Sequence, residues 1–97
     1  MVELRAKEGL LATVVEIILP PEGVITPDEL KRLEVPAVNS RKGVILTGRA
    51  PIWLYGFLVH FFHPTAWIAI YDPRLGPVVI ASHSIEQRVG EILKIEI

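Results

Sequence analysis

The middle of this chain is almost free of charge, and this feature constrains the fold more than any other. Between Val44 and Ile85 only Arg49, Asp72 and Arg74 carry a formal charge, although all three histidines of the chain also lie there. Charged side chains are almost never fully buried without a partner, so a segment this poor in charge indicates a buried core. The few polar residues within it are therefore the first candidates for function.

Length and composition limit what the chain can be. Its 97 residues fit one compact domain, expected over residues 1–97, and 51% apolar with 22% charged residues argues against disorder. The absence of cysteine excludes a disulfide scaffold, a zinc-finger site and a thiol nucleophile. A net charge of −1 argues against a general polyanion binder such as a DNA-binding domain. Any nucleotide recognition must therefore use a few placed groups.

One uncharged run, from Ala50 to Tyr71, is long enough to raise the question of a membrane span. Pro64 and two histidines interrupt the run, and no block of Lys or Arg flanks it. A buried helix followed by a buried strand explains the same hydropathy. The chain also opens without an apolar or Arg-rich leader, so we expect a cytoplasmic protein without a membrane anchor.

Local signals divide the chain into strands and helices. Thr26 as N-cap, Pro27 at the first helical position and Glu29 three residues after the cap predict a short helix. Pro64 prevents a second, longer helix from continuing beyond about His63. The predicted elements, apart from the short helix, are strand Leu10–Leu19, strand Val44–Thr47, helix Pro51–His63 and strands Ala66–Tyr71, Pro77–Ala81 and Glu91–Ile97.

The order strand, helix, strand between Val44 and Tyr71 predicts a βαβ unit with two parallel strands. Apolar runs without alternation support burial of these strands on both faces. The expected fold class is α/β, with a small Rossmann-like sheet as the first choice.

This topology places the polar residues at two opposite edges of the sheet. The edge at which open α/β sheets usually bind ligands is expected to carry Thr47, Gly48, Arg49, Asp72 and Arg74. The other edge, reached by the returning helix and hairpin strand, is expected to carry His60, His63, Ser82 and His83. Because a six-residue strand spans about 20 Å, a histidine and Asp72 can act together only between two molecules stacked edge to edge.

Each candidate also has a purely structural interpretation. His60 and His63, three residues apart on a helix, could bind a divalent metal or transfer protons. Alternatively, His60 packs in the core and His63 is a cation at the helix C-terminus. Asp72 could hold a metal or act as a base, or it could stabilise its own turn.

The remaining candidates are weaker. Arg74 could bind a phosphate through both guanidinium nitrogens, and Thr47-Gly48-Arg49 after a strand suits phosphate contact or only a tight turn. Ser82-His83-Ser84 has no nearby acidic residue to orient a serine triad. The aromatic residues of the uncharged run are expected in the core.

The segment from Arg41 to Ser84 contains three unusual short motifs in a fixed order. They are Gly48-Arg49 with Pro51-Ile52-Trp53-Leu54, His60 with His63-Pro64-Thr65, and Tyr71-Asp72-Pro73-Arg74-Leu75-Gly76. This segment, nearly half of the chain, resembles the small stand-alone CRISPR-associated ring nucleases of type III defence systems. These proteins are distantly related to the CRISPR-associated Rossmann-fold domains.

The resemblance implies a metal-dependent phosphodiesterase that cleaves cyclic tetra-adenylate and prefers Mn²⁺, with RNA 3′-end deadenylation as a related activity. It implies catalytic roles for His63, Asp72 and Arg74, and a metal held by His63 and Asp72, with His60 as a further candidate. The ligand-binding positions that it suggests are Thr47, Gly48, Arg49, Ser82 and His83. It also implies homodimers that stack head to tail into a tetramer or filament around the cyclic ligand.

Two other functions compete with this one. A non-catalytic protein could bind and sequester the cyclic oligoadenylate without cutting it. A structural oligomerisation domain could use the apolar middle of the chain as its interface. Turnover distinguishes the first alternative, and the second predicts no change in size when ligand is added.

Overall fold

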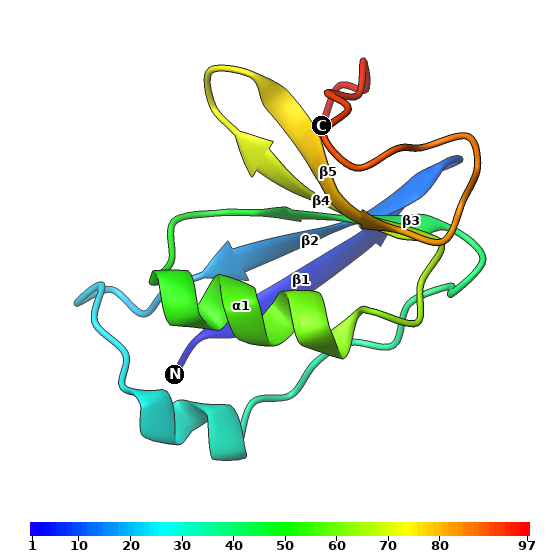
Figure 1. Ribbon diagram of the computed structural model, residues 1–97. Helices are drawn as coiled ribbons and strands as arrows, with labels where there is room; N and C mark the ends of the chain where they lie inside the picture. Colours follow the sequence, from blue (N-terminus) through cyan, green and yellow to red (C-terminus); the bar gives the residue numbers. More distant parts are fainter.

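Five strands form one mixed β-sheet in which the spatial order of the strands follows the chain (Figure 1). The computed structural model describes residues 1–97. The strands are β1 (Glu3–Glu8), β2 (Ala12–Ile18), β3 (Gly43–Thr47), β4 (Trp67–Asp72) and β5 (Gly76–Ser82). The three central strands are parallel, whereas β1 and β5 pair antiparallel with their neighbours.

The predicted βαβ unit is confirmed. Helix α1 (Ile52–Phe61) connects β3 to β4, and these strands pair in parallel with Val44 opposite Ile68. The helix ends two residues before the predicted boundary because Phe62 takes the C-cap position, where its N–H donates to the Leu58 carbonyl at 2.9 Å.

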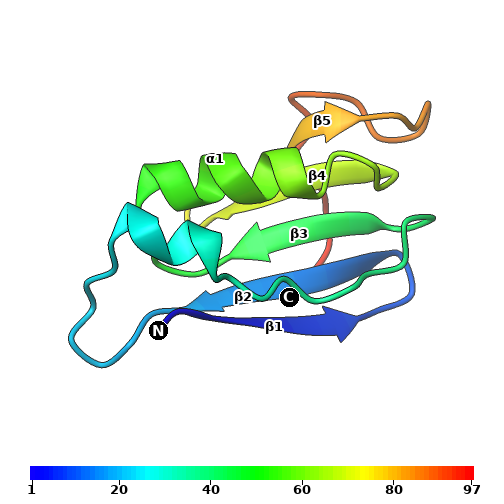
Figure 2. The same ribbon diagram turned by 90° about the horizontal axis from the view of Figure 1, so that it is seen from below.

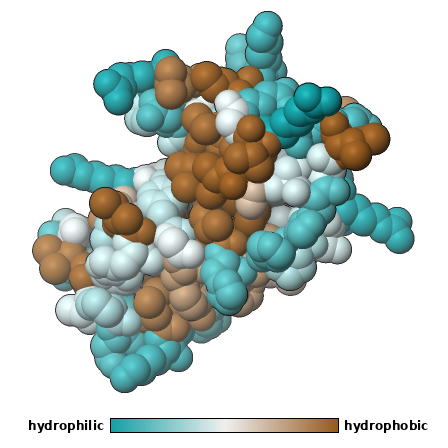
Figure 3. Space-filling model, viewed as in Figure 1, coloured by the Kyte–Doolittle hydropathy of each residue, from teal (hydrophilic) through white to brown (hydrophobic).

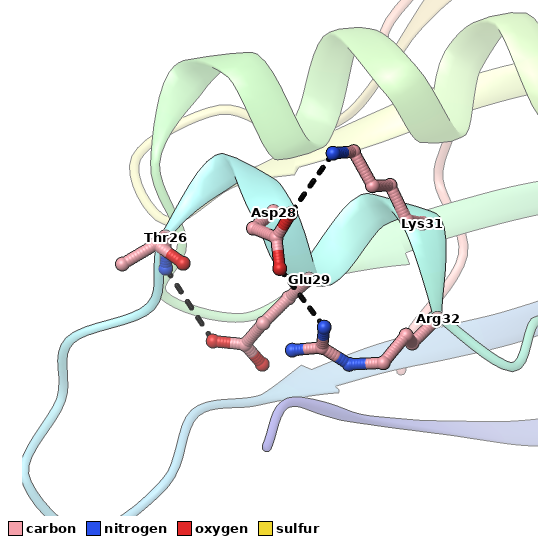
Figure 4. Close-up of polar contacts among 5 residues, drawn as sticks. All are labelled: Thr26, Asp28, Glu29, Lys31 and Arg32. Carbon is pink, nitrogen blue, oxygen red and sulfur yellow. Dashed lines mark hydrogen bonds and ion pairs between the residues drawn. The ribbon is translucent and has the colours of Figure 1, made fainter.

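The predicted short helix is a 3₁₀ helix, η1 (Pro27–Lys31). The Thr26 N–H donates to one carboxylate oxygen of Glu29 at 3.4 Å, and Asp28 pairs with two basic residues of the helix end at 3.1 and 2.9 Å (Figure 4). The other carboxylate oxygen of Glu29 accepts from the Val2 N–H at 3.2 Å. Glu29 therefore connects η1 to the start of the sheet.

The two helices lie on the same face of the sheet (Figure 2). The core on this face consists of Val2, Val15, Ile17, Val44, Leu46, Leu54, Leu58, Phe62 and Ile68. The strand order has no reversal, so the sheet lacks the switch point at which doubly wound sheets bind ligands. The structure is a small α/β fold with one mixed sheet, and its relationship to Rossmann-like sheets stays a prediction.

The predicted strand Glu91–Ile97 is wrong. This segment makes one isolated bridge, between Ile92 and Val78, and otherwise crosses the sheet face opposite the helices. Leu93 is buried there and Ile95 packs beside it. Apolar and charged residues do alternate in this segment. The segment lies across the sheet, however, so its apolar side chains cover the sheet and it adds no further strand.

Strand β1 was not predicted. Its first five residues, Glu-Leu-Arg-Ala-Lys, alternate charged and apolar side chains, and only Leu4 is partly buried. The strand forms because β2 offers a complete antiparallel partner, with Glu3 opposite Ile18 and Glu8 opposite Thr13. The alternation and the short connection that contains Gly9 are the local signals of this hairpin.

The uncharged run from Ala50 to Tyr71 divides into α1, a turn and most of β4. Helix α1 has only ten residues, so it accounts for about half of the run. The run is apolar because two consecutive elements, α1 and β4, each contribute buried side chains. No helix of the structure has both the length and the apolar composition that crossing a membrane requires.

A substitution at Gly43 tests the packing at the start of β3. A Cβ atom on Gly43 would overlap the ring of Trp67, which is buried, while the backbone of Gly43 is in an ordinary conformation. We expect Gly43→Ala to lower the free energy of unfolding by about 1–3 kcal/mol through overpacking. Urea denaturation measures this change.

Trp67→Leu provides the control in a double-mutant cycle. If overlap with the ring is the cause, Gly43→Ala costs much less in the Trp67→Leu background than in the wild type. An equal cost in both backgrounds would contradict the explanation.

Candidate functional site

One edge of the sheet brings two histidines together. His63 lies in the turn after α1, and His83 follows β5. Their rings meet edge to face with centroids 4.9 Å apart, and His83 Nε2 lies 3.1 Å from the carbonyl oxygen of His63. A carbonyl oxygen only accepts, so Nε2 carries the proton in this contact. The backbone N–H of His83 donates to the backbone carbonyl of Ala66 at 2.9 Å, which holds His83 beside the start of β4. We call this the histidine edge.

The loop that carries His83 is held by serine hydroxyls. Ser82 Oγ lies 2.6 Å from the Gln87 carbonyl oxygen and accepts the N–H of Ser84 at 3.0 Å. Ser84 Oγ in turn contacts the Gln87 side chain at 2.9 Å. Ser82, predicted to bind ligand, therefore has an intramolecular role in ordering this loop. Ser84 and Gln87 were missed, although a Ser-x-Ser pattern is a known turn-forming signal.

The opposite edge carries Asp72, which stabilises its own turn as the structural interpretation predicted. Its Oδ1 accepts the backbone N–H groups of Arg74 at 2.8 Å and Leu75 at 3.1 Å. Its Oδ2 receives no hydrogen bond from the chain. One oxygen orders the turn and the other keeps its lone pairs for a ligand, so the two interpretations of Asp72 are compatible. We call this the aspartate edge.

Two cations share the aspartate edge without a partner in the chain. Arg49 follows β3 and Arg74 follows β4, both are exposed, and neither forms an ion pair, even with Asp72. The two loops follow neighbouring parallel strands, so they leave the sheet at the same edge. Exposed guanidinium groups on adjacent loops suit a phosphate.

Gly48 fits the turn between β3 and α1 against the end of β2. Its φ is +116°, and a Cβ atom would overlap the carbonyl oxygen of Ile17. The Tyr55 hydroxyl donates to the carbonyl oxygen of Gly48, which connects α1 to the turn that carries Arg49. Burial raises the pKa of Tyr55. Tyr55 was missed, because a tyrosine inside an apolar helix has no local signal for this contact.

Thr47 faces a different part of the structure from Gly48 and Arg49, which follow it in the sequence. It ends β3 and lines a groove of about 920 Å³ on the sheet face without helices, together with Ile45, Val14 and Tyr71. Gly48 and Arg49 lie at the aspartate edge as predicted. His60 is exposed on α1 and makes no hydrogen bond through its ring.

The two edges lie at opposite ends of β4, as predicted. His63 precedes this strand and Asp72 ends it, so about 20 Å of extended backbone separates them. No group of three His, Cys, Asp or Glu residues in one chain could hold a metal ion. Joint action of the two edges within one chain is therefore excluded by distance, and joint action between chains stays a prediction.

Comparison with known proteins matches residues 18–94 to the family described as CRISPR-associated protein (Cas_csx3). The chain belongs to this family. The matched residues include both edges and α1 and leave out β1. An uncharacterized protein of Aquifex aeolicus (strain VF5) is 48% identical in an alignment of 77 residues, and the match covers 74% of this chain and 69% of that protein.

Membership in the Cas_csx3 family establishes an association with CRISPR systems. The two edges described above lie in the part of the chain that defines the family, whereas the unpredicted strand β1 lies outside it. The candidate site is thus carried by the family segment alone.

A tyrosine substitution tests how α1 holds the Gly48 turn. We expect Tyr55→Phe to lower the free energy of unfolding by about 1 kcal/mol at neutral pH, because the Gly48 carbonyl loses its donor. The pKa of Tyr55 is raised in the folded state, so its contribution is present below about pH 10 and is lost as pH rises through the folded value. The difference in the free energy of unfolding between the wild type and Tyr55→Phe should become smaller above about pH 10.

Chemical denaturation from neutral to alkaline pH measures this difference. Tyr71→Phe is the matched control, because no hydrogen bond of the Tyr71 hydroxyl ties it to the turn. A constant difference for Tyr55→Phe across the whole pH range would contradict the assignment.

Proposed function

We propose that this member of the Cas_csx3 family is a cytoplasmic ring nuclease, a phosphodiesterase that cleaves cyclic tetra-adenylate, with RNA 3′-end deadenylation as a related activity. The observation that carries the proposal is the division of its polar residues: imidazoles at one edge, and a carboxylate with two unpaired guanidinium groups at the other. Both sets are accessible, and neither forms a complete site within one chain.

The two half-sites are joined when chains stack head to tail. The histidine edge of one molecule then faces the aspartate edge of the next, and a flat ring of nucleotides fits between them. Such a contact uses two different surfaces, so it can repeat to give a tetramer of two dimers or a longer filament. In this arrangement His63 of one chain meets Asp72 and Arg74 of its neighbour.

The chemistry follows from an RNA-like ring. The ribose 2′-oxygen attacks the adjacent phosphorus, a 2′-O–P bond forms, and the bond from phosphorus to the 5′-oxygen breaks. An imidazole of the histidine edge accepts the 2′-hydroxyl proton, and a water molecule donates a proton to the departing 5′-oxygen. Arg74 and Arg49 of the aspartate edge neutralise the charge that develops on the phosphate oxygens.

The donor set also fits Mn²⁺, provided that it comes from two chains. The His63 imidazole and the free Oδ2 of Asp72 are nitrogen and oxygen ligands that this ion accepts, and His60 is a further candidate from the same end of α1. When bound, the ion would supply charge neutralisation and a more acidic water. Since the ligands of one chain lie at opposite edges, the ion would bind with the ligand and not to the isolated chain.

Mixing two inactive variants tests the shared site. His63→Ala and Asp72→Ala should each lose at least about 100-fold of activity, because each removes one half-site completely. An equimolar mixture should regain about one quarter of the wild-type rate, because a quarter of head-to-tail junctions unite two intact edges. Chromatography of linear product from excess cyclic tetra-adenylate with Mn²⁺ measures the rate.

The matched control mixes Asp72→Ala with Arg74→Ala. Both changes affect the same edge, so no junction regains a complete aspartate edge and the mixture should stay inactive. Rescue in this control, or none with His63→Ala, would contradict a site shared between chains. Tight binding of the ring by the wild type without product would instead identify a sequestering protein.

Removal of metal should separate activity from folding. We expect chelation to abolish cleavage and Mn²⁺ to restore it, with an unchanged thermal unfolding midpoint, because no metal cluster within one chain holds the fold. Circular dichroism and product analysis on the same samples measure both. A midpoint that falls on chelation would contradict a metal bound only between chains.

A further inference from the structure

Tyr55 is a polar residue of an otherwise apolar helix, and the chemistry proposed above gives it no role. The ten residues of α1, IWLYGFLVHF, carry no formal charge, and only Trp53, Tyr55 and His60 have polar groups in their side chains. Figure 3 shows hydrophobic side chains gathered between the helix and the β4–β5 hairpin. The half-buried Tyr55 packs against the core on this face of the sheet. A tyrosine hydroxyl in such a place usually has a definite hydrogen-bond partner.

Tyr55 makes two hydrogen bonds to the segment that connects β3 to α1. Its hydroxyl donates to the carbonyl oxygen of Gly48. Its backbone N–H donates to the carbonyl oxygen of Pro51 at 3.4 Å. Arg49 and Ala50 are the only residues between these two carbonyl groups. One residue of the helix therefore holds the chain on both sides of Arg49.

Other contacts fix the same segment at each end. The backbone of Gly48 lies so close to the end of β2 that a Cβ atom would overlap the carbonyl oxygen of Ile17. Pro51 has a restricted φ because of its ring, and its carbonyl also accepts the N–H of Leu54 at 3.1 Å. Among all these contacts, the hydroxyl of Tyr55 is the one that a substitution removes without any change to the backbone.

The second arginine of the aspartate edge is held in a comparable way. The backbone N–H of Arg74 donates to Oδ1 of Asp72 at 2.8 Å. Arg49 and Arg74 are both exposed, and in each case a side chain nearby in the sequence fixes the backbone of the turn. A fixed backbone reduces the conformational freedom that an arginine loses when it binds an anion.

We propose that Tyr55 is a positioning residue for Arg49, because its hydroxyl fixes the Gly48 carbonyl and so the direction in which Arg49 extends toward a phosphate. In this role Tyr55 acts through Arg49 and does not itself contact the ligand. The inference deepens the proposed function, on which it rests for the role of Arg49. Its first test uses inorganic phosphate without ring nucleotide, metal or turnover, so its failure and the failure of the nuclease proposal can be distinguished.

Tyr55→Phe is the decisive variant. It removes the donor and keeps the ring that packs against the core, so the protein should remain folded. Inorganic phosphate is titrated while nuclear magnetic resonance follows the side-chain Nε–H signals of Arg49 and Arg74. We expect the dissociation constant read from Arg49 to rise about 3- to 10-fold, which is the range that the ordering of one long side chain costs. The constant read from Arg74 should not change.

A general loosening of the fold would give a different result. Equal weakening at both arginines, no weakening at Arg49, or no response of Arg49 to phosphate in the wild type would each overturn the proposal. Backbone relaxation without ligand gives a second readout. The order parameter of the Arg49 amide should fall from about 0.85 toward about 0.6 in Tyr55→Phe, while that of the Arg74 amide stays constant. An Arg49 amide that stays equally rigid would contradict the positioning role.

Rescue by a related side chain tests whether the hydroxyl acts as a donor. Replacement of Tyr55 by 4-aminophenylalanine keeps the ring and places an N–H donor at the position of the hydroxyl. Phosphate binding at Arg49 should return to within about 2-fold of the wild type. Tyr71→Phe is the matched control, because Tyr71 lines the groove on the sheet face without helices, and it should leave both arginine signals unchanged. Absence of rescue, or an equal effect of Tyr71→Phe, would count against the assignment.

A double-mutant cycle connects this role to the cyclic ligand. Dissociation constants for cyclic tetra-adenylate are measured in chelator, where no cleavage is expected. Tyr55→Phe should weaken binding about 3- to 10-fold in the wild type and in Arg74→Ala, and should have no further effect in Arg49→Ala. A full effect of Tyr55→Phe in the Arg49→Ala protein would overturn the proposal. A wild type that binds phosphate at Arg49 but not the ring would support the positioning role and refute the nuclease proposal.

Discussion

The parallel pairing of β3 with β4 is the constraint on which the rest of this structure depends. Two parallel neighbours cannot be joined by a tight turn, so α1 must carry the chain back along the full length of the sheet. This return separates the turn after β3 from the turn after α1 by the length of a strand. The histidine edge and the aspartate edge are direct consequences, because His63 follows the helix and Asp72 follows β4.

The same unit is held by close contacts at both ends of β3. Gly43 lies under the ring of Trp67 at the histidine edge, and Gly48 fits against the backbone of Ile17 at the aspartate edge. Both contacts leave no room for a side chain, so each end of β3 is fixed relative to a neighbouring strand. The turns that carry the candidate residues thus start from fixed positions, and rigid elements below a site hold its groups in place.

The sequence predicts those parts of the fold that local chemistry determines. Pro64 stops the helix, β-branched runs form the central strands, and Thr26 with Glu29 starts η1, because each signal acts within a few residues. The course of Leu93 across the sheet depends on partners far away in the chain, such as Ala12 and Ile45, and no local pattern encodes it. Strand β1 instead pairs with the strand that directly follows it, so its alternating residues are a local signal that was missed. At the site, positions at the two edges follow from topology, whereas the Tyr55 and Ser82 contacts depend on packing that the sequence does not display.

Hydrogen bonding separates the groups that maintain the fold from those left for a ligand. Asp72 uses one oxygen for its turn and Ser82 uses its hydroxyl for its loop, whereas the guanidinium groups of Arg49 and Arg74 have no partner in the chain. These two guanidinium groups are the ones that the proposed function assigns to binding the phosphate groups of the ring. The uncharged outer side of α1 lies between the edges and is chemically unlike either of them.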